Sequence, residues 1–516
     1  FSLRAKRRVG GAPRSTMANP QSQRTPGPLS LVVVGAGPAG LTAAWENARH
    51  GGTSTVLERD RVVGGIARTV EHRGYRFDIG GHRFFTKVRE VEELWRSMLD
   101  EDLLRVPRRS RILYRGRFFS YPLKPLEAFL GLGPVESVRC GLSFLASRMR
   151  PRRPEDDFET WVSNRFGRRL FSIFFRTYTE KVWGVPCTQI RADWAAQRIR
   201  SLSLGKALWH AVKPDRNVRT LIDSFDYPRL GPGQMWEAFR RKLEERGTRV
   251  LLERPVTRVA WEPGRGVTGV VTDGPGGPER HVGDAVVSSM PLADLVEALD
   301  PAPPENVRDA ARALRYRDFI LVALVFEGER FFPDNWVYVH SPDVRIGRIQ
   351  NFNNWSAAMV PRPGVTCLGL EYFCFSTDPI WSTPDEELLE TGREEIVRTG
   401  LVPPGTPVVD GSVVRMPKTY PMYDPGYGRN VAAVRGFLSG SLPNLLQVGR
   451  NGLHRYDNQD HAMVTGMQAV RNLYGAAHDL WAVNVDDEYH EEARELRPPG
   501  SAPGSRTSPT PGRASS

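Results

Sequence analysis

The sequence predicts an α/β protein: a doubly wound parallel sheet with a helical region and a mixed-sheet region inserted into it. Three observations lead to this prediction. A wholly apolar run at 31–34 passes through a glycine-rich turn into a helical pattern and then a second apolar run, the order of a βαβ unit. Residues 101–224 are rich in helical patterns. Residues 301–434 alternate short β runs with Pro and Gly turns.

The first βαβ unit begins with an apolar strand and ends at an acidic residue. Residues 31–34 are Leu and three Val, as expected for a strand buried on both faces of a parallel sheet. The next turn has the pattern G-x-G-x-x-G. Residues 41–48 then read as a helix, and residues 55–57 as a strand that ends at Glu58. In this context the motif is typical of a dinucleotide-binding site.

Each part of the motif has a physical reason. Gly35 makes the tight turn, Gly37 lets the backbone approach a pyrophosphate, and Gly40 allows close packing of helix on strand. The N–H groups at the start of the helix favour phosphates. Glu58 is placed to accept hydrogen bonds from the adenosine ribose, and its charge would repel a 2′-phosphate. The motif therefore favours FAD or NAD over NADP.

Later segments predict further elements in chain order. They are a helix at 158–166, strands at 250–252, 255–259, 284–288 and 319–325, and a helix at 460–473. We expect a discontinuous nucleotide-binding domain at 30–100, 225–300 and 435–485, a helical insertion at 101–224, and a mixed-sheet substrate region at 301–434.

The formal net charge of +12 lies mostly at the two ends of the chain. Residues 1–30 hold six Arg or Lys, residues 497–516 hold three, and neither segment has an acid, so only +3 remains between them. Both ends are rich in Pro, Gly, Ser and Thr, and we expect disordered tails at 1–29 and 486–516. A nearly neutral folded part gives no reason to expect a nucleic-acid or membrane partner.

The cysteine and hydropathy patterns point to a cytoplasmic protein. The four Cys are scattered without a C-x-x-C pair, which indicates a reducing compartment and no metal site. The sequence has no run of 18 or more apolar residues, so we expect no membrane span.

Six motifs, in order, resemble a known group of flavoproteins. Gly64-Gly65 is similar to the extended FAD fingerprint of the group that contains amine oxidases, protoporphyrinogen oxidase and UDP-galactopyranose mutase. Gly80-Gly81-His82 resembles the stretch that approaches the isoalloxazine ring in that group. Four later segments narrow the resemblance to the UDP-galactopyranose mutase-like branch. They are F-F-S-Y-P at 118–122, T-Y-T-E-K-V-W-G at 177–184, T-Y-P-M-Y-D at 419–424, and V-G-R at 448–450 with R-Y-D-N-Q-D at 455–460.

The resemblance covers roughly residues 30–480 and implies a Rossmann-like FAD-binding domain of the glutathione-reductase type. The implied cofactor is FAD, with NAD(P)H as an external reductant. The residues implied or predicted to contact the cofactor are Gly35, Gly37, Pro38, Ala39, Gly40, Glu58, Arg59, Gly64, Gly65, Arg68, Gly81, His82, Val256, Gly449, Arg450, Asp457 and Asn458.

The resemblance also implies a substrate site. Arg348 corresponds to an arginine that grips the substrate diphosphate, since its fork pairs phosphate oxygens. Tyr420 corresponds to a substrate-contacting tyrosine, His82 to a neighbour of the flavin, and Trp183 to an active-site wall. Arg198 lies close to the place of a second diphosphate-gripping arginine. Plainer interpretations remain open: a structural histidine, a solvated arginine, and core aromatic residues.

The chain also departs from the mutase pattern. A gap-free alignment places Leu202 where the mutases have their second arginine. His454 and Asp457 stand where the mutases present two tyrosines to the diphosphate. An aspartate there would repel a diphosphate, which puts the mutase substrate itself in doubt.

Two functions from different classes follow. The first is the mutase-like one, in which reduced flavin N5 attacks the anomeric carbon of a sugar nucleotide and a pyranose becomes a furanose without net redox change. The alternative is an FAD-dependent oxidoreductase that abstracts a hydride, in the manner of amine oxidase or protoporphyrinogen oxidase. A protein that uses FAD only structurally is a third hypothesis.

Overall fold

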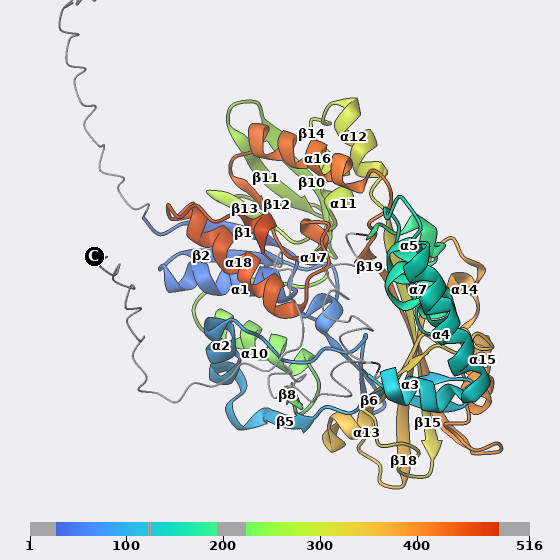
Figure 1. Cartoon of the computed structure of the whole chain (residues 1–516). Helices are drawn as coiled ribbons and strands as arrows, with labels where there is room; N and C mark the ends of the chain where they lie inside the picture. Colours follow the sequence, from blue (N-terminus) through green and yellow to red (C-terminus); the bar gives the residue numbers. More distant parts are fainter. Residues whose placement is uncertain (1–26, 122, 124, 193–222, 484–516) are drawn as a thin grey trace, which may run out of the picture.

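The computed structural model describes residues 27–121, 123, 125–192 and 223–483. Arg198, Leu202 and most of both predicted tails lie outside these residues. The described chain forms a five-stranded, a four-stranded and a seven-stranded sheet, with two short two-stranded ribbons. Figure 1 shows the five-stranded sheet and its helices on the left, the four-stranded sheet at the top, and the seven-stranded sheet on the lower right beside the helices α3 to α7.

The glycine-rich turn belongs to the five-stranded sheet, which is parallel throughout. Its strands, in spatial order, are β20 (Leu445–Gln447), β13 (Ala285–Ser288), β1 (Ser30–Val34), β2 (Thr53–Leu57) and β9 (Arg249–Leu251). The helices that pack around its core are α1 (Pro38–Arg49), α2 (Arg89–Leu99), α10 (Gly233–Glu244) and α18 (Gln459–Leu473). The predicted strands at 31–34, 55–57 and 284–288 and the helix at 460–473 correspond to β1, β2, β13 and α18.

The four-stranded sheet packs on one face of the five-stranded sheet, where Val32 and Val286 share an apolar core with Val259 and Val270. Its strands, in spatial order, are β12 (Glu279–His281), β11 (Gly266–Thr272), β10 (Val256–Glu262) and β14 (Leu299–Asp300). A shared apolar core joins it to α11 (Leu292–Glu297), α12 (Glu305–Arg312) and α16 (Tyr427–Ser441).

The seven-stranded sheet is mixed, because β6 and β16 pair in parallel while its other neighbours are antiparallel. Its strands, in spatial order, are β19 (Val408–Pro421), β15 (Tyr316–Glu327), β18 (Val365–Cys374), β17 (Arg348–Asn351), β16 (Trp336–Val339), β6 (Ser110–Tyr114) and β7 (Arg117–Ser120). Three short helices and one longer helix accompany it: α13 (Phe352–Trp355), α14 (Pro379–Ser382), α17 (Gly449–Gly452) and α15 (Asp385–Arg398).

The stretch 101–224, predicted to be helical, contains strands as well as helices. β6 and β7 form a hairpin whose two turn residues, Arg115 and Gly116, both have positive φ, as a tight hairpin turn requires. β5 (Leu103–Pro107) pairs with β8 (Ser224–Pro228), which begins at the end of this stretch. Before the stretch, β3 (Thr69–His72) pairs with β4 (Tyr75–Asp78). Strands as short as β5, β6 and β7 lack the length over which a two-residue period separates strand from helix. The division of the chain into domains stays a prediction.

Five helices of that stretch gather on the outer side of the seven-stranded sheet (Figure 1). They are α3 (Pro125–Leu132), α4 (Pro134–Met149), α5 (Phe158–Phe166), α6 (Arg168–Phe171) and α7 (Thr177–Trp183). The fold class is confirmed: a Rossmann-like parallel sheet carries inserted helical and mixed-sheet regions. None of the described helices is long and apolar enough to cross a bilayer.

Candidate active site

A long cavity of about 580 Å³ opens at the carboxyl end of β1 and β2, a usual size for a small-molecule site. Its lining includes most of the residues predicted for the cofactor: Gly35, Gly37, Pro38, Ala39, Glu58, Arg59, Gly65, Arg68, His82, Val256, Gly449, Arg450, Asp457 and Asn458. Gly40, Gly64 and Gly81 do not line this cavity. A cavity at this end of a parallel sheet is where open α/β folds bind ligands.

The turn between β1 and α1 is shaped by three glycines with three different requirements. Gly35 has φ +96°, a left-handed conformation, and a Cβ there would lie 2.2 Å from Ser289 Oγ. A Cβ on Gly40 would lie 1.9 Å from the carbonyl oxygen of Gly35. A Cβ on Gly37 would meet no protein atom closer than 3.9 Å. The fold therefore requires glycine at 35 and 40, whereas at 37 the requirement must come from a ligand.

The first turn of α1 is arranged to receive an anion. Gly37 is the N-cap, so no side chain caps the first N–H groups, and the first turn contains no acid. Glu58 lies at the end of β2, where its carboxylate accepts hydrogen bonds from the N–H of Ala36 at 2.7 Å and of Asp60 at 3.0 Å. Burial raises the pKa of Glu58. The glycine left open at 37, the uncapped helix and the buried acid together fit a dinucleotide.

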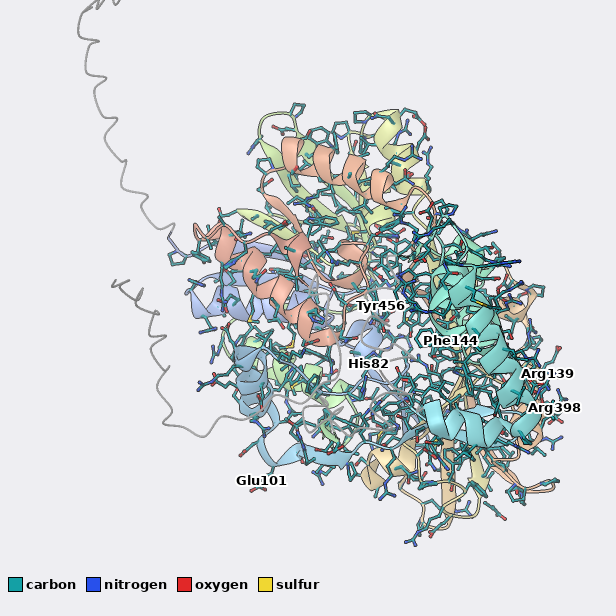
Figure 2. All side chains as sticks on the ribbon, in the orientation of Figure 1. His82, Glu101, Arg139, Phe144, Arg398 and Tyr456 are labelled. Carbon is teal, nitrogen blue, oxygen red and sulfur yellow. The ribbon has the colours of Figure 1, made fainter. Side chains whose placement is uncertain are left out.

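A second, narrower cavity of about 60 Å³ adjoins the long one and shares His82, Arg450 and Asn458 with it. The remaining described residues around it include Gly81, Arg83, Arg348, Tyr420 and Tyr456. Figure 2 shows His82 and Tyr456 near the middle of the molecule, between α18 and the helices α3 to α7. The structure thus brings together His82, Arg348 and Tyr420, which lie far apart in the sequence.

Arg348 is held in place from two sides. It sits on β17 directly opposite Glu371 of β18, and its Nε donates to the Glu371 carboxylate. Its Nη2 donates to the Tyr420 hydroxyl at 3.1 Å. Glu371 is fully buried and also accepts from Gln350 Nε2 at 2.8 Å. Although burial disfavours the charge, Glu371 opposite it raises the pKa of Arg348 above its usual value, so the guanidinium stays cationic.

Two aromatic rings and a second arginine complete this end of the cavity. Tyr420 and Tyr456 stack with their ring centres 5.8 Å apart and their planes 11° from parallel. The Arg450 guanidinium lies over both rings and donates two hydrogen bonds to the Asp457 carbonyl oxygen, at 2.7 and 2.9 Å. The result is a flat, cationic pocket wall.

His82 is neutral in this setting. Its Nδ1 lies 3.1 Å from the Gly80 carbonyl oxygen, an acceptor, so Nδ1 carries the proton. Burial and the nearby Arg450 and Arg348 lower the pKa of His82 to about 3. The ring therefore acts as a fixed polar group at ordinary pH.

Trp183 lines neither cavity. It is buried in the apolar core of the helices α5 to α7, and its nearest described ring partner is Tyr423, with ring centres 6.4 Å apart. The same motif contributes in another way, since Lys181 donates from Nζ to three carbonyl oxygens: Val339 at 3.2 Å, Ser341 at 2.6 Å and Ile346 at 3.1 Å. These bonds tie α7 to the segment that leads into Arg348. The predicted role of Trp183 as a wall of the active site stays a prediction.

His454 and Asp457, expected to face a diphosphate, do not face the narrow cavity. His454 has φ +45°, which turns its ring into the core, where Nε2 lies 3.2 Å from the Met422 carbonyl oxygen. Asp457 lines the long cavity. Between them Tyr456 reaches the narrow cavity. The repulsion expected from an aspartate beside Arg348 is therefore absent from this geometry.

Four residues at these cavities were not among the predicted site residues, and Arg83 of the narrow cavity is one of them. Glu371 holds Arg348, Tyr456 stacks on Tyr420, and Gln459 lines both cavities. Tyr456 and Gln459 lie within the R-Y-D-N-Q-D motif at 455–460, so the motif itself was a signal for them. Glu371 lies in an apolar run, and a lone acid in a buried strand was the available signal.

The comparisons with known proteins agree with this geometry. A family model described as flavin containing amine oxidoreductase matches residues 38–399, more than half of the chain. The chain belongs to this family. Because the family is described as flavin containing, and because the long cavity fits a dinucleotide, FAD is supported as the cofactor.

Its curated relatives match over limited stretches. 15-cis-phytoene desaturase from Synechococcus elongatus is 25% identical over 52% of this chain and 59% of its own length. Inactive all-trans-retinol 13,14-reductase from Danio rerio is 42% identical over 11% of this chain and 10% of its own length. The chain thus covers less than two thirds of each of these relatives.

Solved structures match over nearly the whole chain. Reduced UDP-galactopyranose mutase superposes with a TM-score of 0.77 at 22% identity, over 89% of this chain and 98% of that one. A putative protoporphyrinogen oxidase from Exiguobacterium superposes with a TM-score of 0.64 at 18% identity, over 86% and 98%. Putrescine oxidase bound to putrescine gives 0.56 at 17% identity, over 87% and 99%. The predicted resemblance to UDP-galactopyranose mutase is confirmed at the level of the fold. The predicted membership of the amine oxidase superfamily is confirmed by the family model.

Proposed function

We propose that this amine oxidoreductase family member binds FAD and acts on an anionic glycosyl substrate such as a sugar nucleotide, converting a pyranose into a furanose. The observation that carries the proposal is the narrow cavity. Its described lining has three arginines (Arg83, Arg348 and Arg450) and no carboxylate. Such a wall attracts a diphosphate and repels a cationic amine.

The bound flavin, when reduced, would supply a nucleophilic N5 nitrogen for the anomeric carbon. The residues of the chain position the substrate around it. The Arg348 fork binds the diphosphate and stabilises its charge as it departs, while Glu371 keeps the fork oriented. Tyr420 and Tyr456 offer hydroxyl groups to phosphate or sugar oxygens. His82 donates a hydrogen bond from Nδ1 to the Gly80 carbonyl oxygen and presents a neutral ring.

The roles of the predicted cofactor residues belong to the same proposal. The N-terminal N–H groups of α1 would hold the pyrophosphate and Glu58 the adenosine ribose. The start of α18, at Asn458 and Gln459, lines the cavity near His82, so its dipole favours negative charge there. NAD(P)H as the external reductant stays a prediction, and the tests below therefore use dithionite.

An FAD-dependent oxidoreductase is the second candidate, and one observation favours it. The stacked Tyr420 and Tyr456 rings, with Ile66, Ile79 and Phe85 nearby, make a flat and partly apolar slot. Such a slot would also accept a planar apolar substrate. The phytoene desaturase and protoporphyrinogen oxidase likenesses agree with this candidate.

Arg348→Ala tests the diphosphate site. We expect the variant to bind UDP about 10-fold or more weakly, because charge-assisted hydrogen bonds are lost, while flavin content stays the same. Titration calorimetry with UDP measures the affinity and the absorbance of the bound flavin measures the content. Arg345→Ala is the matched control, since Arg345 is exposed on the same segment.

Arg348→Ala also leaves Glu371 buried without its partner, so Arg348→Lys is the second variant. It keeps a charge opposite Glu371 and loses only the fork. Wild-type UDP affinity in both variants would show that Arg348 does not bind the diphosphate.

A further inference from the structure

The outer side of α4 carries a continuous apolar stripe. Its side chains are Val135, Val138, Leu142, Leu145 and Met149, and each is 56–77% exposed. We call these five residues the α4 face. The opposite side of the helix is the one that packs on the protein: Cys140 is buried, and Phe144 contacts the same core. Figure 2 shows Arg139 of this helix at the outer edge of the molecule.

The spacing of the α4 face is regular. Steps of three and four residues repeat along its whole length, so all five side chains lie on one side of the helix. Leu130 of the neighbouring α3 is also highly exposed. Scattered single exposed residues need no explanation, but a contiguous apolar row on a helix marks an interaction surface.

The charge of the segment that contains the α4 face indicates the sign of the charge on its partner. Residues 115–153 hold eight Arg and Lys against two Glu, a net charge of +6, whereas the rest of 31–496 sums to −3. Arg139 and Arg148 stand on the two flanks of the face and are exposed. Of the two acids, Glu136 already pairs with Arg139 and Arg169, and Glu127 accepts hydrogen bonds from Ser120.

A second copy of the chain fits this charge poorly. An isologous contact would bring together two copies of a segment whose own net charge is +6. Its flanking positions would place arginines near arginines, where helix pairs ordinarily carry opposite charges. A partner with an apolar interior and a negatively charged surface would match both the apolar row of α4 and the arginines on its flanks.

We propose that the α4 face docks this protein on an anionic lipid bilayer. The apolar row enters the interface between headgroups and acyl chains, with the helix in the plane of the membrane. The flanking arginines remain at the level of the headgroups and pair with lipid phosphates. Docking needs no spanning helix, and it is independent of the reaction proposed for the cavity.

Co-sedimentation with vesicles tests the proposal. The full-length protein is mixed with vesicles of one part phosphatidylglycerol to three parts phosphatidylcholine, and with vesicles of phosphatidylcholine alone. We expect binding to the first, weakened as salt rises above about 0.1 M, and much less binding to the second. Leu142→Glu with Leu145→Glu should lower the partition coefficient about 10-fold or more.

Two controls separate the α4 face from other causes. Val282→Glu changes a residue that is 65% exposed outside α4, and it should bind like the wild type. The basic ends of the chain are present in every variant, so binding through them would survive the double substitution. Equal binding of the double variant and the wild type overturns the proposal. The proposal is also overturned if the wild type does not bind the vesicles. It is overturned as well if the wild type is a dimer in solution and the double variant is a monomer.

Discussion

Arg348 stays charged in a partly buried position because a single carboxylate faces it from the neighbouring strand. Glu371 compensates the burial of the guanidinium, and the Tyr420 hydroxyl accepts from its other end. A buried pair of this kind adds little net stability, but losing one partner costs about 3–5 kcal/mol. The pair therefore fixes where the positive charge stands.

His454 gives a prediction about pH. Burial lowers the pKa of His454 to about 4, whereas in the unfolded chain it is close to 6.5. Between these values the unfolded chain binds the extra proton, so this residue makes the folded state less stable as pH falls from about 6.5 to about 4. His454→Asn keeps a residue that tolerates positive φ and removes the titration.

The expected result is a smaller pH dependence in the variant. Going from pH 7 to pH 5, the wild type should lose about 2 kcal/mol more unfolding free energy than His454→Asn. Urea unfolding of both proteins at the two pH values measures this difference. An equal loss in both would mean that His454 is protonated in the folded protein.

At the scale of the element, the turn between β1 and α1 separates ligand contacts from packing. Gly37→Val should abolish FAD retention and leave the fold intact, because its side chain would enter the cavity and not the protein. Gly40→Val should unfold the protein, because its Cβ would collide with the Gly35 carbonyl oxygen. Bound flavin and thermal unfolding are measured for both variants.

The test compares the flavin content of Gly37→Val with the stability of Gly40→Val. A Gly37→Val protein that keeps full flavin content would contradict the assignment of the turn to the cofactor. A Gly40→Val protein as stable as the wild type would contradict the packing described for α1.

The segment 177–184 shows how an element can serve a site without lining it. The sequence motif predicted that Trp183 stands at the active site, and the structure places it in a helical core. Lys181 of the same segment anchors α7 to the carbonyl groups just before β17. Such long-range hydrogen bonds depend on tertiary geometry, which a linear motif does not contain.

At the scale of the molecule, the parallel sheet was predictable and the mixed sheet was only partly so. Residues 31–34 and 285–287 are apolar throughout because parallel strands are buried on both faces, and this pattern is visible in the sequence. β6 and β7 were missed because both strands are short and the pairing of β6 with β16 joins segments more than 200 residues apart. Likewise Arg348 could be named from the family resemblance, whereas its partner Glu371 required the strand register.

The charge of the whole molecule also changes meaning with the structure. The sum between the two ends is +3, which gave no reason to expect a membrane partner. The sum hides a segment of net charge +6, residues 115–153, and the structure places the exposed α4 face within it. A net charge describes a surface only when its distribution is known.

We expect the cavity to perform chemistry on a sugar nucleotide without net redox change. The direct test is to reduce the flavin-loaded protein with dithionite under anaerobic conditions, remove the excess, and add UDP-galactopyranose and other nucleotide sugars. Product is measured by chromatography and the flavin by its absorbance. We predict a furanose product while the flavin stays reduced over many turnovers. Flavin reoxidation in proportion to product, or no furanose from any nucleotide sugar, would contradict the account.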